Sequence, residues 1–230
     1  PEWIEQLVVA SDSYLFRRES EDGAKDSVIA GYPWFGDWGR DTMIALPGLT
    51  LTTGRPALAR AILETFSGYV QDGLLTNVFP GSGETPEYNT ADAGLWFIEA
   101  WRAYVEASDD FATLKRAFPA LVRIIAAYRQ GTRFGIGVDA QDGLVRAGEP
   151  GQQLTWMDAR VDGQVITPRH GKPVEINALW YNALRSMAGF ARRIGVPAAQ
   201  FDALADAAQA AFARFDRGAG GGLFDVLDAP

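Results

Sequence analysis

The chain has 230 residues, of which 47% are hydrophobic and 22% charged, a composition typical of a folded globular protein rather than a disordered one. Its formal net charge is −8 and its Lys and Arg residues form no cluster, so we expect no nucleic acid and no anionic membrane as partners. It contains no Cys and a single His, which excludes disulfides, thiolate metal sites and a multi-His zinc site.

Hydrophobic periodicity predicts a mostly helical chain. Pro47 is expected to disturb one helix and Pro119 to break and restart another, because proline lacks the amide that a helix interior needs. The stretch 136–148 predicts a β-hairpin turned at Asp142-Gly143, and 223–226 is compatible with a strand. The predicted helices cover residues 2–18, 41–53, 58–70, 90–107, 109–131, 173–194 and 197–215.

The connections between these helices alternate between very short turns and long segments. The long ones, 19–40, 73–89 and 133–172, are rich in Gly, Pro and aromatic residues. This alternation predicts helix pairs layered into a toroid, with the long loops gathered at one end, where function is usually carried. No apolar run approaches the roughly 20 residues of a membrane helix. The absence of Cys fits a reducing compartment, and we expect a cytoplasmic protein.

Four segments, 33–41, 85–97, 154–160 and 167–184, concentrate aromatic and charged residues. Each lies in a long loop or at the start of the helix that follows one, so we expect them to meet at one rim of the toroid. Sugars suit such a mixture, because their C–H faces lie on aromatic rings and their hydroxyls need fixed polar partners. Five of the seven Trp lie in these segments: Trp34, Trp38, Trp96, Trp156 and Trp180.

Asp92 lies at the predicted start of a helix, with Thr90 as N-cap and Trp96 on the same helical face. An acidic residue there can simply complement the helix dipole. It can also be the general acid of a glycosidase, which must hold a proton. A helix N-terminus favours the charged carboxylate, so burial against Trp96 or a second carboxylate would have to oppose the dipole. The residues alone leave both interpretations open.

Two further segments repeat the pairing of an aromatic ring with a carboxylate. Arg40 and Asp41 can hold adjacent sugar hydroxyls above Trp38, or can form an ion pair that pins a loop. Trp156 and Asp158 show the same pattern. These residues are therefore candidates for sugar binding.

One face of the helix predicted over 173–194 combines apolar and polar residues. Asn177, Trp180, Tyr181 and Leu184 share it, and Glu175 lies near the start of the same helix. Buried Asn and Tyr must find hydrogen-bond partners, which either a polar ligand or a neighbouring loop can supply.

Four motifs together resemble the glucosidase domain of glycogen debranching enzymes, the amylo-α-1,6-glucosidases. They are "AGYPWFGDWGRDTMIALPGL", "PEYNTADAGLWF", "GEPGQQLTWMDAR" and "TPRHGKPVEINALWYNAL". The resemblance runs from about residue 3 to the C-terminus. It implies an all-α fold, the (α/α)6 barrel of six-hairpin glycosidases shared with glucoamylases. It also implies inverting hydrolysis of α-1,6-linked glucose stubs on an α-glucan such as glycogen or a limit dextrin, without a metal or organic cofactor.

The resemblance assigns roles to individual positions. Asp92 matches the general acid, and Arg40 with Asp41 resembles the pair that grips the terminal glucose in glucoamylases. The remaining candidates for substrate binding are Trp38, Trp96, Trp156, Asp158, Glu175 and Trp180.

The chain departs from the family pattern in its extent. The barrel has twelve helices where we predict about seven, and no motif here matches the family's later glutamate, the general base. We therefore expect residues 1–230 to form part of the glucosidase domain, without its N-terminal β-rich domain or the end of its barrel, and to be inactive alone. Two alternatives stay open: another inverting glycosidase of this class, glucoamylase-like, trehalase-like or mannosidase-like, or a carbohydrate-binding module without catalysis.

Overall fold

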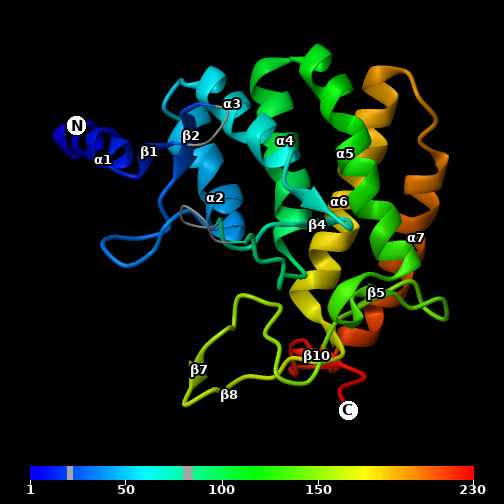
Figure 1. Cartoon of the computed structure of the whole chain (residues 1–230). Helices are drawn as coiled ribbons and strands as arrows, with labels where there is room; N and C mark the ends of the chain where they lie inside the picture. The colour runs from blue at the N-terminus through cyan, green and yellow to red at the C-terminus, as the bar shows by residue number, and fades with distance from the viewer. Residues whose placement is uncertain (20–22, 80–84) are drawn as a thin grey trace.

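The computed structural model describes residues 1–19, 23–79 and 85–230 (Figure 1). The described part of the chain contains seven α-helices, and a π-helical turn, Pro47–Leu51, continues the second of them. The α-helices are α1 Glu2–Asp12, α2 Gly39–Leu46, α3 Pro56–Ser67, α4 Ala93–Ser108, α5 Phe111–Gln130, α6 Val174–Ile194 and α7 Ala199–Phe212. None of the helices in this part is long and apolar enough to cross a membrane.

Within residues 1–19, 23–79 and 85–230 the strands are short and form five antiparallel pairs. In four pairs no helix separates the two strands, whereas β9 and β10 pair across α6 and α7, which lie between them in the chain. In the pair β5–β6, Val138 lies opposite Val145, which confirms the hairpin expected over 136–148. The strands are β1 Leu15–Arg18, β2 Lys25–Val28, β3 Val70–Gln71, β4 Leu74–Leu75, β5 Gly137–Val138, β6 Val145–Arg146, β7 Arg160–Val161, β8 Gln164–Val165, β9 Lys172–Pro173 and β10 Val226–Leu227.

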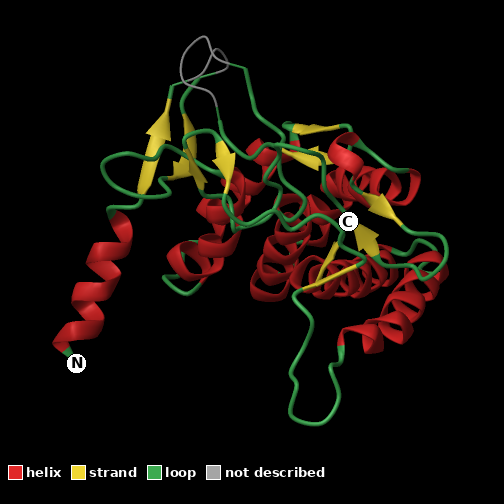
Figure 2. Cartoon of the chain, turned by 90° about the horizontal axis from the view of Figure 1, so that it is seen from below, coloured by secondary structure: helices red, strands yellow, loops and turns green. Residues whose placement is uncertain are grey.

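Short connections join the helices in pairs along the chain: α2 to α3 through the π-helical turn, α4 to α5, and α6 to α7. Each long connection leads into the first helix of a pair. Figure 1 shows the connection carrying β7 and β8, and the segment carrying β10, below the helices. Figure 2, viewed from that side, shows loops and strands lying across the helix ends. The N-termini of α2, α4 and α6 therefore face the end of the molecule where the long loops lie.

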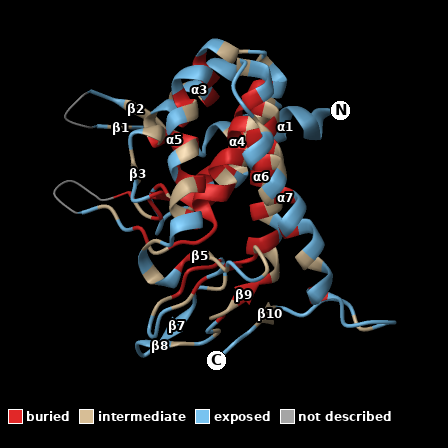
Figure 3. Cartoon of the chain, turned by 90° about the vertical axis from the view of Figure 1, so that its right-hand side faces the viewer, coloured by how far each residue is buried: buried red, intermediate tan, exposed pale blue. Residues whose placement is uncertain are grey.

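The core lies around α4, which Figure 3 shows buried along much of its length, whereas α1 and α7 present exposed faces. Trp101 on α4 and Trp180 on α6 have no exposed surface. Tyr128 on α5 stacks on Trp180 with ring centroids 5.8 Å apart and planes 11° apart. The apolar stripes predicted for the three helices thus converge on one interior.

Two predicted helix boundaries were wrong. The first helix ends at Asp12 rather than continuing to residue 18, and 15–18 pair as β1 with β2. The expected break at Pro119 is absent, because α5 runs unbroken through it. Pro119 is exposed, and burial of Leu114 and Leu121 on the opposite stripe offsets the cost of the lost hydrogen bond, about 3 kcal/mol.

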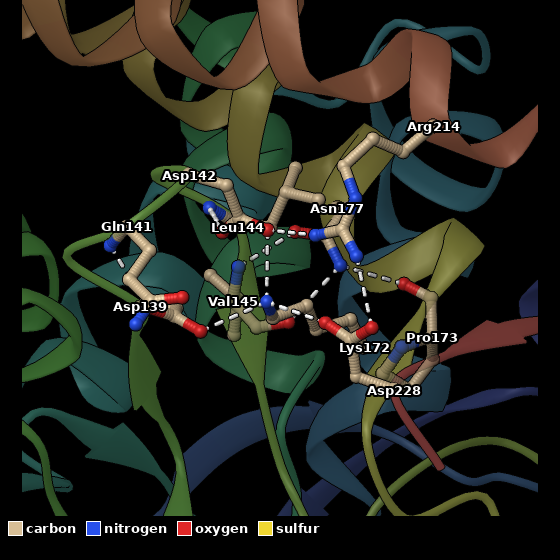
Figure 4. A network of polar contacts seen from close by, with 10 residues as sticks. All are labelled: Asp139, Gln141, Asp142, Leu144, Val145, Lys172, Pro173, Asn177, Arg214 and Asp228. Atoms are coloured by element: carbon tan, nitrogen blue, oxygen red, sulfur yellow. Dashed lines mark hydrogen bonds and ion pairs between the residues drawn. The ribbon is translucent and has the colours of Figure 1, made fainter.

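A buried lysine connects the hairpin to the start of α6 and to the C-terminal segment (Figure 4). The Lys172 side chain is 5% exposed, and its Nζ lies 2.9 Å from Asp139 Oδ2 and 2.8 Å from Asp142 Oδ2 and Asp228 Oδ2. Burial lowers the pKa of Lys172, but the hydrogen bonds from the three carboxylates outweigh it, so the pKa is raised. Asp142 also pairs with Arg214. This network holds the hairpin, β9 and the C-terminal segment together at the end of the molecule where the long loops lie.

Candidate active site

A cleft of about 540 Å³ lies where α2, α4 and α6 begin. Its lining combines aromatic and aliphatic surface with three carboxylates and one guanidinium. The helices supply most of it, and the loop before β7 adds Trp156. The lining residues are Arg40, Ile44, Asp92, Trp96, Glu99, Trp156, Glu175, Ala178, Leu179 and Asn182.

Asp92 is the most deeply buried carboxylate of this cleft, with 1% of its surface exposed. It occupies the N-cap position of α4, one residue outside the first turn in which the sequence placed it. The Thr90 hydroxyl donates to Asp92 Oδ1 at 2.6 Å and accepts from the amide of Ala93 at 3.1 Å. Asp92 rather than Thr90 is thus the N-cap residue, but the Thr90 hydroxyl still satisfies a free amide of the helix end and holds Asp92 as well.

Arg40 joins two carboxylates across the cleft. Its Nε donates to Asp92 Oδ2 at 2.6 Å, and its Nη1 lies 3.5 Å from Asp158 Oδ2. Burial lowers the pKa of Arg40, but the charges of Asp92 and Asp158, with that of Asp41, outweigh it, so the pKa is raised. Arg40 thus stays charged, and only the Asp158 end of the contact lies in solvent, with a side chain 47% exposed.

Asp41 follows Arg40 in the first turn of α2 but does not line the cleft. Its side chain reaches solvent, yet removal from water by the surrounding protein raises its pKa, against the lowering effect of Arg40. The charges of Asp158 and Asp92 add to the rise. Asp41 therefore holds its proton to a higher pH than an ordinary aspartate.

The opposite wall carries Glu175, in the first turn of α6. Arg169 donates to both oxygens of Glu175 from its two terminal guanidinium nitrogens, with Nη2 2.6 Å from Glu175 Oε2. The same Arg169 binds Asp225, with its Nη2 2.7 Å from Asp225 Oδ1. Trp156 lies at the mouth with 57% of its surface exposed, and Trp96 is half-buried on α4. The cleft thus combines two carboxylates held by arginines with two indole rings, of which Trp156 is the more exposed.

Not all the predicted residues come together. Trp180 has no exposed surface and packs in the core behind the wall, so it does not reach the cleft. Trp38 lines a neighbouring cleft together with Asp158. Asn177 is buried, and its side chain bonds the backbone N–H and C=O of Val145, so a neighbouring strand rather than a ligand supplies its partners. Trp34 is 84% exposed and lines neither of these two clefts.

Sequence reasoning missed two polar residues of the cleft, Glu99 and Asn182. Asn182 Nδ2 donates to Glu99 Oε2 at 2.7 Å, joining α6 to α4. Burial raises the pKa of Glu99, but its bonds from Arg102 and Asn182 outweigh burial and lower it. Helical spacing could have found both, because Glu99 is three residues after Trp96 and Asn182 seven after Glu175.

Comparison with known proteins identifies the family to which this chain belongs. A family model described as amylo-alpha-1,6-glucosidase matches residues 9–230. The chain belongs to this family of glycoside hydrolases. It is 28% identical to the glycogen debranching enzyme of Saccharomyces cerevisiae, over 69% of this chain and 14% of that protein. The chain therefore spans a small part of the length of this relative.

The fold also resembles a solved structure, described as a rhamnosidase from Klebsiella oxytoca with rhamnose bound. The TM-score is 0.56 at 20% identity, covering 76% of this chain and 32% of that one. At this identity the likeness concerns the fold alone. It confirms the predicted class, helical hairpins of the (α/α)6 glycosidase type, for this member of the amylo-alpha-1,6-glucosidase family.

Proposed function

We propose that the chain contributes the acid side of an inverting glucosidase, which removes α-1,6-linked glucose from branch stubs of glycogen or a limit dextrin. The observation that carries this proposal is Asp92, a carboxylate 1% exposed that nevertheless lines a cleft with aromatic walls. Membership of the amylo-alpha-1,6-glucosidase family supports the substrate class.

In this mechanism Asp92 protonates the glycosidic oxygen while a water attacks the opposite face of the sugar. The guanidinium of Arg40, with Asp158 beside it, would bind hydroxyls of the terminal glucose. Trp96 and Trp156 would cover its C–H faces. The general base is proposed to be a glutamate of a later family motif, which no stretch of these residues matches.

The acid has to hold a proton, yet Arg40 and Thr90 both donate to Asp92 in the structure. We propose that sugar hydroxyls and Asp158 draw the guanidinium away from Asp92 when substrate binds. Release of that contact would free Asp92 Oδ2 to carry the proton that it donates to the glycosidic oxygen.

The test is Asp92→Asn in the full-length gene product, assayed by glucose release from a limit dextrin. We expect turnover to fall by roughly 10²–10⁴-fold, the contribution of a general acid, with glucose binding retained. Asp206→Asn is the matched control, because Asp206 is an exposed carboxylate on α7 paired with Arg185. Near-normal turnover in Asp92→Asn would show that another residue is the acid.

A further inference from the structure

Arg169 is a buried cation that the proposed mechanism does not use. It lies between β8 and β9, and its side chain is only 3% exposed. Burial lowers the pKa of Arg169, but its hydrogen bonds to Glu175 and Asp225 outweigh burial and raise it, so the guanidinium is charged. A buried guanidinium needs partners for its charge and for its N–H groups. Two carboxylates from different parts of the chain supply them.

One of these carboxylates, Glu175, lines the cleft that also contains Asp92. Its two oxygens accept from the two terminal nitrogens of Arg169, with Nη2 2.6 Å from Oε2. Such a bidentate contact fixes both the position and the plane of a carboxylate. The Glu175 side chain is still 28% exposed, and a carboxylate has about four acceptor sites, so it can also accept from a ligand in the cleft.

The other carboxylate, Asp225, lies outside the cleft, directly before β10. Arg169 donates to it from Nε at 2.9 Å and from Nη2 at 2.7 Å. The backbone carbonyl of Asp225 accepts from the amide of Val174, the first residue of α6, at 3.0 Å. Asp225 is thus anchored to the start of α6, although its side chain is 61% exposed. The two carboxylates therefore bind two different edges of the same guanidinium.

Contacts of this kind can serve the fold alone. A carboxylate in the first turn of a helix complements the helix dipole, and Asp225 ties the C-terminal segment to α6. The place of Glu175 points to a further role, because Arg169 fixes a side chain of the cleft wall. A group that binds a substrate must be held close to its productive geometry by the residues around it. Arg169 gives Glu175 that support, and Asp225 gives it to Arg169.

We propose that Arg169 is a positioning residue of the glucosidase site, which holds the Glu175 carboxylate in the orientation that accepts a hydroxyl of the terminal glucose. This inference rests on the proposed function. It makes Asp225, and with it the segment before β10, a support of a cleft that Asp225 does not line. The hydroxyl is present in the bound substrate and in the transition state alike. Loss of the support should therefore raise KM more than it lowers kcat.

The experiment measures KM and kcat for glucose release from a limit dextrin by the full-length gene product. We expect Glu175→Gln to raise KM roughly tenfold, with kcat less affected. Asp225→Ala should raise KM about threefold and leave kcat unchanged, because it acts only through Arg169. Asp206→Ala is the matched control, because Asp206 is also an exposed carboxylate paired with an arginine.

Combined variants separate positioning from a general effect on the fold. In a Glu175→Gln background, Asp225→Ala should raise KM no further, because the carboxylate that it supports is already lost. Arg169→Lys keeps the charge but loses the bidentate contact, so its KM should rise roughly tenfold, as in Glu175→Gln.

A purely structural role predicts a different pattern. Asp225→Ala would then lower Tm and leave KM unchanged, or raise KM equally with and without the Glu175 carboxylate. Either result, or an unchanged KM in Glu175→Gln, would overturn this inference and leave Asp92 as the acid. Because Asp225 is exposed, its variant tests the inference even if Arg169→Lys does not fold. No glucose release by the wild-type protein would overturn the inference and the proposed function together.

Discussion

Lys172→Met should strongly destabilise the protein, because it removes the cation at the centre of three carboxylates while keeping the length of the side chain. Lys172 is 5% exposed, and the carboxylate of Asp142 beside it is 13% exposed. Removing one partner of a buried ion pair costs about 3–5 kcal/mol. Asp228 is 48% exposed and can regain water, and Arg214 still contacts both Asp142 and Asp228. We therefore expect the lower end, about 3 kcal/mol.

For a chain of this length that loss corresponds to a fall in Tm of about 6–12 °C. Urea denaturation followed by circular dichroism at pH 7 measures it. Lys115→Met on α5 is the matched control, because Lys115 is exposed and its removal should cost less than about 0.5 kcal/mol. If the free energy of unfolding of Lys172→Met fell by less than about 1 kcal/mol, burial would not make the ion pairs of Lys172 important for stability.

The same network predicts a pH dependence. The pKa of Asp139 is lowered by the amide of Gln141 and by Lys172, and the pKa of Asp228 is lowered by Lys172 and Arg214. Lowered carboxyl pKa values stabilise the fold above about pH 4, the ordinary aspartate value, and this stabilisation is lost as pH falls through the folded values. The difference in stability between wild type and Lys172→Met should therefore shrink below about pH 4. A difference that stays constant down to pH 2 would contradict the electrostatic account.

Three further substitutions test the site and its supports. Thr90→Val removes the hydroxyl that donates to Asp92, so kcat on limit dextrin should fall roughly 10-fold or more with little change in KM; an unchanged kcat would show that Thr90 only caps α4. Trp156→Ala should raise KM several-fold without changing Tm, because the ring is 57% exposed at the cleft mouth. Asp37→Asn should cost about 2–3 kcal/mol in urea denaturation, because Asp37 is 4% exposed and bonded by Arg18 and the Ser27 hydroxyl; a loss under 0.5 kcal/mol would count against that structural role.

Local signals were sufficient to predict much of the fold. The helix predicted over 173–194 is α6, which lies between Pro173 and Gly195. Gly195 adopts the left-handed conformation, with φ 78°, that a helix C-terminus favours. The hairpin over 136–148 followed from its Asp142-Gly143 turn. By contrast, the ring of carboxylates around Lys172 joins residues from three distant segments, and no local pattern encodes such a contact.

The site was predictable in part, for a topological reason. Arg40 and Asp92 meet because both lie where a long loop enters the first helix of a hairpin, and that alternation is visible in the sequence. The sequence did not show which face of α6 meets the core, because apolar and polar residues occur together on more than one face of this helix. Trp180 consequently turned out to lie in the core, whereas Leu179 and Asn182 line the cleft.

The most direct test of the central claim follows the anomer of glucose first released from a limit dextrin by the full-length gene product, using proton NMR. Inverting hydrolysis with Asp92 as acid predicts β-glucose before mutarotation. α-Glucose as the first product would mean retention of configuration and would contradict the mechanism.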